Sequence, residues 1–166
     1  MTIPLPVGVP HTSDEFTILN DFLDYYRAVI ARKLDGLDAE QMRWSPVDSG
    51  TSIGGIVRHL GFVERWWFQA VFAGNRCEFP WSEEDPDADF LMPPEEDAAS
   101  VIAFYLSECD RSRELVAAAP DLDVVITRGE RDTTLRWILV HMIEETARHA
   151  GHADILREML DGATGD

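Results

Sequence analysis

The chain has 166 residues, of which 45% are hydrophobic and 10% aromatic, a composition typical of one globular domain with a substantial core. Its formal net charge at pH 7 is -17. We therefore expect no binding to nucleic acid or to anionic membranes, because both attract basic protein surfaces. No apolar run approaches the roughly 18 residues that a membrane span needs, so the sequence predicts a cytosolic protein.

Residues 1–11 are rich in proline, and we expect an extended arm there. Thr12 and Glu15 have the spacing of a capping box and predict the start of a first helix. Apolar residues then recur at helical spacing, which indicates a buried face, and Gly36 is expected to end the helix. That face carries Phe16, Leu19, Leu23, Tyr26, Ile30 and Leu34.

A second helix is predicted to start near Ser52 and to close at Gly74. Three glycines inside it are poor helix formers, so we expect the helix to pack closely against a neighbour there: Gly54, Gly55 and Gly61. A polar connection of about 20 residues follows, long enough to cross a bundle from end to end or to lie over a site. We interpret its acidic stretch, SEEDPDAD, as a solvated loop, because it lacks the ligand spacing of an EF-hand.

A third helix is predicted over residues 95–118, where Pro120 follows, and a fourth from residue 133 or 134 to about residue 160, before Gly162. The segment DVVITRGERDT between them is β-prone or a turn. Four amphipathic helices with one long crossover between the second and the third predict an all-α fold, a four-helix bundle. We expect a single domain over residues 1–166.

Polar side chains interrupt the apolar stripe predicted for the fourth helix: His141, Glu145, His149 and His152. The same stripe carries Leu135, Ile138, Met142, Leu156 and Met159. Because burial of an unpaired polar group costs free energy, these side chains need a compensating partner. Glu145 and His149 are four residues apart and project side by side from successive turns. Helix bundles build metal sites from inward-facing acidic and histidine side chains of this kind.

His59 lies on the predicted buried face of the second helix and would complete a set of three ligands with Glu145 and His149. Three protein ligands leave one position open to water or substrate, as in catalytic zinc sites. Each part also has a plainer interpretation, since His59 alone could be a hydrogen-bonded core residue and the other two a simple ion pair. The three together favour a metal. His141 and His152 could then support the ligands, contact substrate or replace a ligand.

Cys77 and Cys109 form no metal-type pair, and we expect both to be free thiols, with Cys109 in the core. We interpret the adjacent Trp66 and Trp67 as packing residues and not as a platform for a cofactor.

Two stretches of the sequence, SIGGIVRHLGFVERWW and LVHMIEETARHAGHADILREMLDG, resemble the DinB-like superfamily. These metal-binding four-helix bundles include mycothiol-dependent maleylpyruvate isomerase and bacillithiol transferase. The resemblance implies one metal ligand at His59 and two, four residues apart on the last helix, at Glu145 and His149. Glutamate at the first of these two positions resembles the N-terminal metal-binding domain of the mycothiol-dependent isomerase. The family also makes a homodimer a reasonable expectation.

The predicted function is therefore a metal-dependent enzyme of the thiol-transferase or isomerase type, acting on a small molecule. A divalent metal would activate a low-molecular-weight thiol such as mycothiol. Zinc is the default for two histidines and a glutamate, with nickel, manganese and iron as alternatives. His152 or His141 would carry protons. The other functions compatible with the sequence are a metal-dependent hydrolase and a non-catalytic, stress-associated metal-binding bundle.

Overall fold

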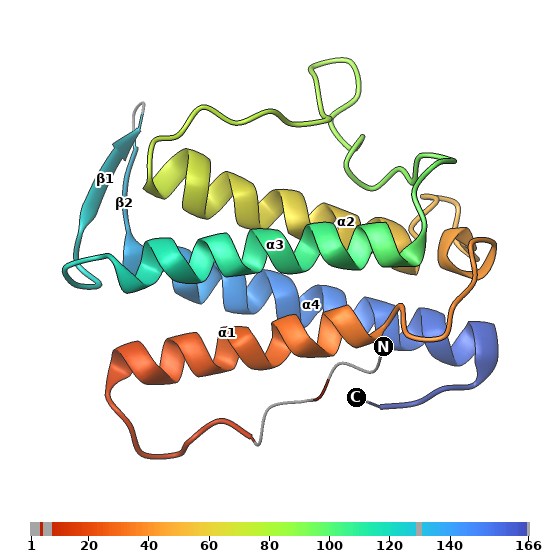
Figure 1. Ribbon diagram of the computed structural model, residues 1–166, viewed down its shortest axis with the longest axis horizontal. Helices are drawn as coiled ribbons and strands as arrows, with labels where there is room; N and C mark the ends of the chain where they lie inside the picture. The colour runs from red at the N-terminus through yellow and green to blue at the C-terminus, as the bar shows by residue number, and fades with distance from the viewer. Residues whose placement is uncertain (1–3, 5–7, 129–130, 166) are drawn as a thin grey trace.

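The computed structural model describes residue 4 and residues 8–128 and 131–165. Its long helices are α1 (Glu15–Arg32), α2 (Ile53–Glu64), α3 (Ala98–Ala117) and α4 (Leu135–Asp161) (Figure 1). A π-helical segment, η2 (Arg65–Phe72), continues α2, and one 3-10 turn, η1 (Gln41–Arg43), precedes α2. A small antiparallel hairpin, β1 (Val125–Arg128) and β2 (Arg131–Thr134), leads into α4. The predicted all-α fold of four helices is confirmed.

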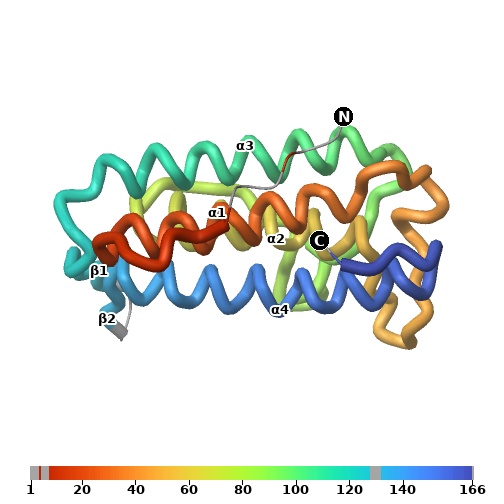
Figure 2. The backbone as a smooth tube through the Cα atoms, turned by 90° about the horizontal axis from the view of Figure 1, so that it is seen from below, coloured from red at the N-terminus to blue at the C-terminus, as the bar shows by residue number. Residues whose placement is uncertain are grey.

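The helices run in two directions. α1 and α4 lie side by side and run one way, whereas α2 and α3 lie side by side and run the other way (Figures 1 and 2). Because α2 and α3 are parallel, the chain between them must return along the whole bundle. Residues 73–97 form this crossover, which passes above α2 in Figure 1. The predicted long crossover between the second and third helices is therefore present.

The first helix begins differently from the sequence-based prediction. Its N-cap is Asp14, whose carboxylate accepts a hydrogen bond from the Thr17 backbone N–H at 3.0 Å. The predicted capping box of Thr12 and Glu15 is wrong, because an acidic cap one turn before Thr17 already satisfies the free amide there. The helix ends before Gly36, which has a φ of 78° in the turn that follows.

The starts of α3 and α4 follow capping chemistry as well. Asp97 caps α3 in a reciprocal capping box with Ser100, so this helix starts later than the predicted residue 95. Thr134 caps α4 by accepting from the Trp137 backbone N–H, and Gly162 ends it at a φ of 77°, as the sequence predicts. The segment predicted as β-prone forms the hairpin; residues 129 and 130 at its tip lie outside the described residues.

Two hydrophobic clusters fill the bundle, and α4 contributes to both. One cluster contains Met142, and the other contains Ala150. Glu145 and His149 therefore lie in the interval between two apolar regions. The second half of the stripe predicted for α4 is partly wrong, because Met159 is exposed near the end of the helix. Both cysteines are free, and Cys109 is buried as expected.

A close approach between α2 and the crossover fixes the position of the loop. A Cβ atom on Gly55 would lie 2.3 Å from the Phe90 carbonyl oxygen, so only glycine allows this contact. A Cβ atom on Gly61 would lie 2.5 Å from the ring of Phe104 on α3. The expected close packing at these glycines is confirmed. None of the helices in the described ranges is sufficiently long and apolar to cross a membrane.

Candidate metal centre

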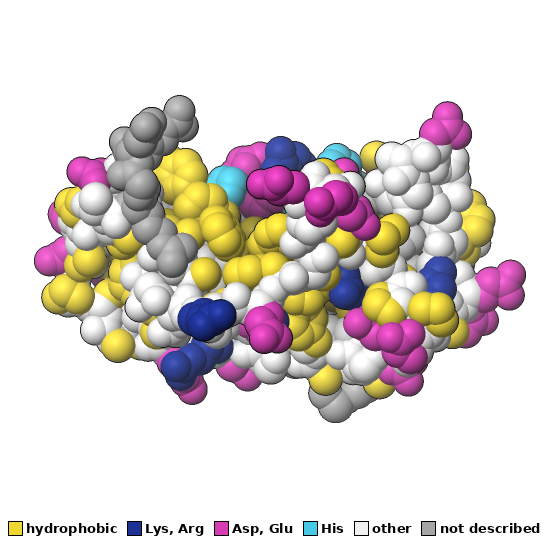
Figure 3. Space-filling model, turned by 90° about the horizontal axis from the view of Figure 1, so that it is seen from above, with side chains coloured by type: hydrophobic (Ala, Val, Ile, Leu, Met, Phe, Trp, Pro, Cys, Tyr) yellow, Lys and Arg dark blue, Asp and Glu magenta, His cyan; other side chains and the backbone are white. Residues whose placement is uncertain are grey.

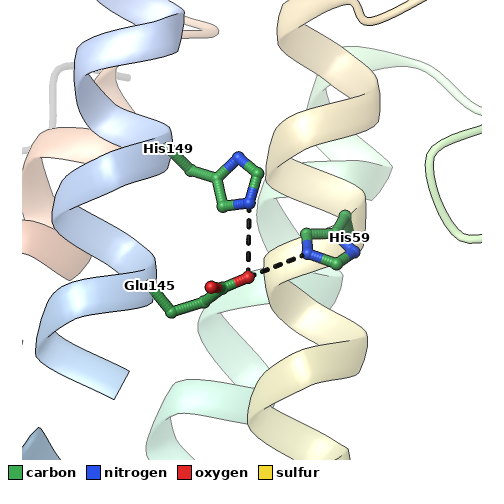
Figure 4. A group of neighbouring side chains, drawn as sticks. All are labelled: His59, Glu145 and His149. Carbon is green, nitrogen blue, oxygen red and sulfur yellow. Dashed lines mark hydrogen bonds and ion pairs between the residues drawn. The ribbon is translucent and has the colours of Figure 1, made fainter. Parts of the chain in front are cut away.

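Three side chains from two antiparallel helices meet in the middle of the bundle (Figure 4). His59 comes from α2, and Glu145 and His149 come from successive turns of α4. Glu145 Oε1 lies 3.3 Å from His59 Nε2 and also 3.3 Å from His149 Nε2. The three ligand atoms all lie within 4.8 Å of one another. The structure thus brings together the three residues that the sequence grouped.

The hydrogen bond to Nδ1 of His59 determines whether its other ring nitrogen, Nε2, carries a proton or a free lone pair. Asp89 Oδ2 lies 2.6 Å from His59 Nδ1, and a carboxylate at that distance accepts the Nδ1 proton. The Nε2 of a neutral His59 then turns a lone pair toward the Glu145 carboxylate. Two acceptors 3.3 Å apart repel unless a proton or a cation lies between them. In a tetrahedral zinc site, with bonds of roughly 2.0–2.1 Å, neighbouring ligand atoms lie about 3.4 Å apart.

His149 is neutral under ordinary conditions, which is the form that binds a metal. Burial, followed by the charges of His59 and Arg148, lowers the pKa of His149 to about 4. Its Nδ1 is buried and has no hydrogen-bond partner among the described residues, so the ring is held by packing and by its Nε2 contact.

Glu145 is held from its outer side. The Arg148 guanidinium, half-exposed at the rim, contacts Glu145 Oε2 and also pairs with Glu144. This leaves Oε1 as the oxygen that faces both imidazoles. The buried carboxylate thus has a cationic partner on one side and a pair of histidines on the other.

Asp89 is a site residue that the sequence analysis missed. It lies within the acidic stretch interpreted as a solvated loop, but it is only 4% exposed, so that interpretation is wrong at this end of the loop. Arg58 on α2 donates to the carbonyl oxygens of Ala88 and Asp89, and the Phe90 ring stacks on His59 at 3.9 Å. The apolar residues directly after Asp89 were the available signal, since they mark where the crossover returns to the bundle.

The family model described as Mycothiol-S-transferase matches residues 18–162. The chain belongs to the mycothiol-S-transferase family. The matched range runs from the first turn of α1 to the end of α4 and includes the whole His59, Glu145 and His149 cluster. The resemblance to a mycothiol-related branch of DinB-like proteins is confirmed. None of the curated proteins matches the chain.

In this member of the mycothiol-S-transferase family, the other two α4 histidines lie outside the three-residue cluster. His152 is exposed, with its ring edge-to-face with His149 at 5.4 Å, and partial burial followed by the charge of His149 lowers its pKa. His141 stacks on Trp137 at 5.1 Å and meets Trp67 edge-on at 4.9 Å. The prediction that both face the core is wrong for His152. The apolar stripe predicted for α4 extends beyond the part of the helix surface that neighbouring elements cover, and His152 lies in the uncovered part.

A small pocket opens beside the cluster. It has a volume of about 240 Å³, and its walls include His59, Asp89, Phe90, Trp66 and Trp67. Trp66 is part-exposed and Trp67 is partly buried, so both reach the surface, in line with packing at the rim of the bundle. A small molecule in this pocket would lie against His59 and, through it, next to the three converging ligand atoms.

Proposed function

We propose that the protein is a metal-dependent transferase that joins the sulfur of mycothiol to an electrophilic small molecule. Two facts support this proposal: the family of the chain and the cluster in its core. The single observation that carries the metal is the convergence of His59 Nε2, Glu145 Oε1 and His149 Nε2 on one point. Three acceptor atoms in a largely buried position repel one another unless protons or a cation lie between them, and one divalent cation would satisfy all three.

The proposed ligands are His59, Glu145 and His149, and the proposed metal is zinc, which suits two imidazoles and one carboxylate. Nickel, manganese or iron could occupy the same ligands, because affinity alone does not decide occupancy. A divalent metal held by these three residues would supply Lewis-acid chemistry, which would favour the thiolate form of a bound thiol.

The other residues of the site orient these ligands and handle the proton. Asp89 keeps the proton of His59 on Nδ1, and Arg148 holds the outer oxygen of Glu145. His152 stands at the exposed rim with a lowered pKa, so its neutral ring can accept the proton that the thiol loses. His141 is the alternative proton acceptor, one turn before Glu145.

The proposed transfer is a substitution and needs no oxidant or reductant. The thiol sulfur forms a bond to the electrophilic carbon while the bond from that carbon to its leaving group breaks. The leaving group departs with the electron pair of that bond, and the thiol proton goes to an imidazole and then to water.

The decisive experiment measures transfer to iodoacetamide with mycothiol, on protein loaded with zinc and on protein stripped of metal. Glu145→Gln keeps the size of the side chain and removes its charge, and Glu144→Gln is the matched control on the exposed neighbouring carboxylate. We expect a rate that needs both metal and mycothiol and that drops only in Glu145→Gln. Equal rates in all preparations would favour a non-catalytic bundle. Metal-dependent but thiol-independent turnover of an ester would favour a hydrolase.

A further inference from the structure

A second, larger cavity lies between η2, the start of α4 and the hairpin, and it shares Trp66 and Trp67 with the pocket beside His59. Its volume is about 680 Å³, within the range of roughly 300–1000 Å³ that is usual for small-molecule sites. Its walls are mainly apolar and include Trp66, Trp67, Val71, Val125 and Trp137. We call it the tryptophan groove. Figure 3 shows hydrophobic side chains gathered at one end of this face of the molecule, with a histidine at their edge.

The tryptophan groove adjoins the pocket beside His59. Trp66 and Trp67 belong to the walls of both cavities, so a molecule that lies against these two indoles is adjacent to the pocket beside His59. A second connection runs along α4. Trp137 stacks on His141, which lies one turn before Glu145.

The surface chemistry of the groove selects among possible ligands. Exposed aromatic rings bind planar apolar groups by stacking and cations through their ring faces. Trp137 is 50% exposed and Val125 is 60% exposed, so both walls are available to a ligand. Asp132 also lines the groove, and the net charge of the chain is -17, so an aromatic anion would be repelled.

We propose that the tryptophan groove binds the planar aromatic part of the electrophilic substrate, and that this substrate is neutral or cationic. The proposal rests on the proposed transferase function and adds the substrate class to it. The ring lies against Trp137 and Trp67, and the reactive carbon points past Trp66 toward the pocket beside His59. The sulfur then bonds to that carbon while the leaving group departs from it with the bonding electron pair.

Binding is tested first, with unreactive probes and without any transfer. Tryptophan fluorescence is titrated with 4-nitrobenzyl alcohol, 4-nitrobenzylammonium and 4-nitrobenzoate, which share one ring and differ in charge. We expect the neutral and cationic probes to bind at least tenfold more tightly than the anion, and zinc-loaded and metal-stripped protein to agree within about twofold. Equal binding of 4-nitrobenzoate would overturn the proposal.

Variants then locate the probe. Trp137→Ala should weaken binding of 4-nitrobenzyl alcohol at least tenfold, whereas Ile155→Ala, an exposed apolar residue further along α4, should leave it unchanged. Val125→Asp changes the part of the groove formed by β1 without altering a helix and should weaken the same binding, so the proposal stays testable if Trp137→Ala fails to fold. Unchanged affinity in a folded Trp137→Ala or Val125→Asp protein would contradict the assignment.

Substrate preference is tested with the loaded enzyme. The ratio of kcat/KM for 4-nitrobenzyl chloride to kcat/KM for iodoacetamide should fall at least fivefold in Trp137→Ala, mainly because KM for 4-nitrobenzyl chloride rises. The same ratio should be unchanged in Ile155→Ala. Light scattering tests the alternative that the groove is an interface between two copies. If the protein is a dimer that Trp137→Ala dissociates, this alternative holds and the proposal is overturned. Probe binding without any thiol transfer would leave the groove in place and reject the proposed function alone.

Discussion

Asp89 Oδ2 lies 2.6 Å from His59 Nδ1, although the two residues are 30 positions apart and Asp89 belongs to an acidic crossover. The contact keeps the imidazole proton on the side away from the cluster. It also holds the ring in one orientation, with Phe90 stacked on its face. A metal-binding histidine commonly has such a carboxylate behind it.

Asp89→Asn should therefore weaken metal binding by about 10- to 100-fold without unfolding the protein, because the neutral amide is a poorer acceptor for the His59 proton. Competition with a chromophoric chelator measures the affinity, and circular dichroism checks the helices. Asp85→Asn, an exposed carboxylate in the same crossover, is the control and should bind metal as tightly as wild type. If Asp89→Asn also retained wild-type affinity, the contact would be a packing feature only.

His59→Ala should abolish tight binding of metal, even though His59 lies 86 positions from Glu145, its nearest proposed co-ligand along the chain. We expect about one divalent ion per wild-type chain, because three ligands surround one point. Elemental analysis of purified protein measures the ratio. His11→Ala removes an exposed histidine of the N-terminal arm and should keep one ion per chain. Full occupancy in His59→Ala would make the three-ligand assignment untenable.

The stability of the metal-stripped protein should depend on pH through His149. Its folded pKa of about 4 lies below the ordinary histidine value of 6.5, so between these values the unfolded chain binds a proton that the folded chain does not. Stability is then fully present above pH 6.5 and declines as pH falls toward 4. Between pH 7 and pH 5 the loss from this group is at most about 2 kcal/mol.

Urea denaturation of metal-stripped wild type and of His149→Gln at pH 7 and pH 5 measures this effect. The variant lacks the titrating group, so its loss of stability over the same interval should be smaller. Other carboxylates titrate in both proteins and cancel in the comparison. Identical losses would show that His149 is not held neutral by its surroundings.

Gly55→Ala should destabilise the protein by roughly 1–3 kcal/mol, because the new Cβ would lie 2.3 Å from the Phe90 carbonyl oxygen. The crossover must then move away from α2, and the contact between Asp89 and His59 should loosen with it. We expect a lower urea midpoint and also weaker metal binding. Gly151→Ala is the control within α4, where a Cβ meets open space, and should stabilise the helix by about 1 kcal/mol. A neutral Gly55→Ala would mean that the crossover tolerates displacement.

The local sequence by itself determined the helices and half of the candidate centre. Helical periodicity depends only on residues near one another in the chain, so the four helices could be placed without knowledge of their neighbours. Glu145 and His149 are four apart, and any α-helix brings such side chains together. His59 could be grouped with them because its helix also has one apolar face. The start of α1 was misplaced because two possible caps lie close together and only one meets the free amides.

Only the tertiary structure decided how the rest of the site is assembled. The burial of Asp89 depends on the course of a crossover that has no periodicity, and that course is set by Gly55, where the absence of a side chain lets the loop touch α2. The exposure of His152 and the groove beside Trp137 depend on which parts of the α4 surface its neighbours leave uncovered. Such features arise from contacts between residues far apart in the chain, and local spacing does not encode which of those contacts form.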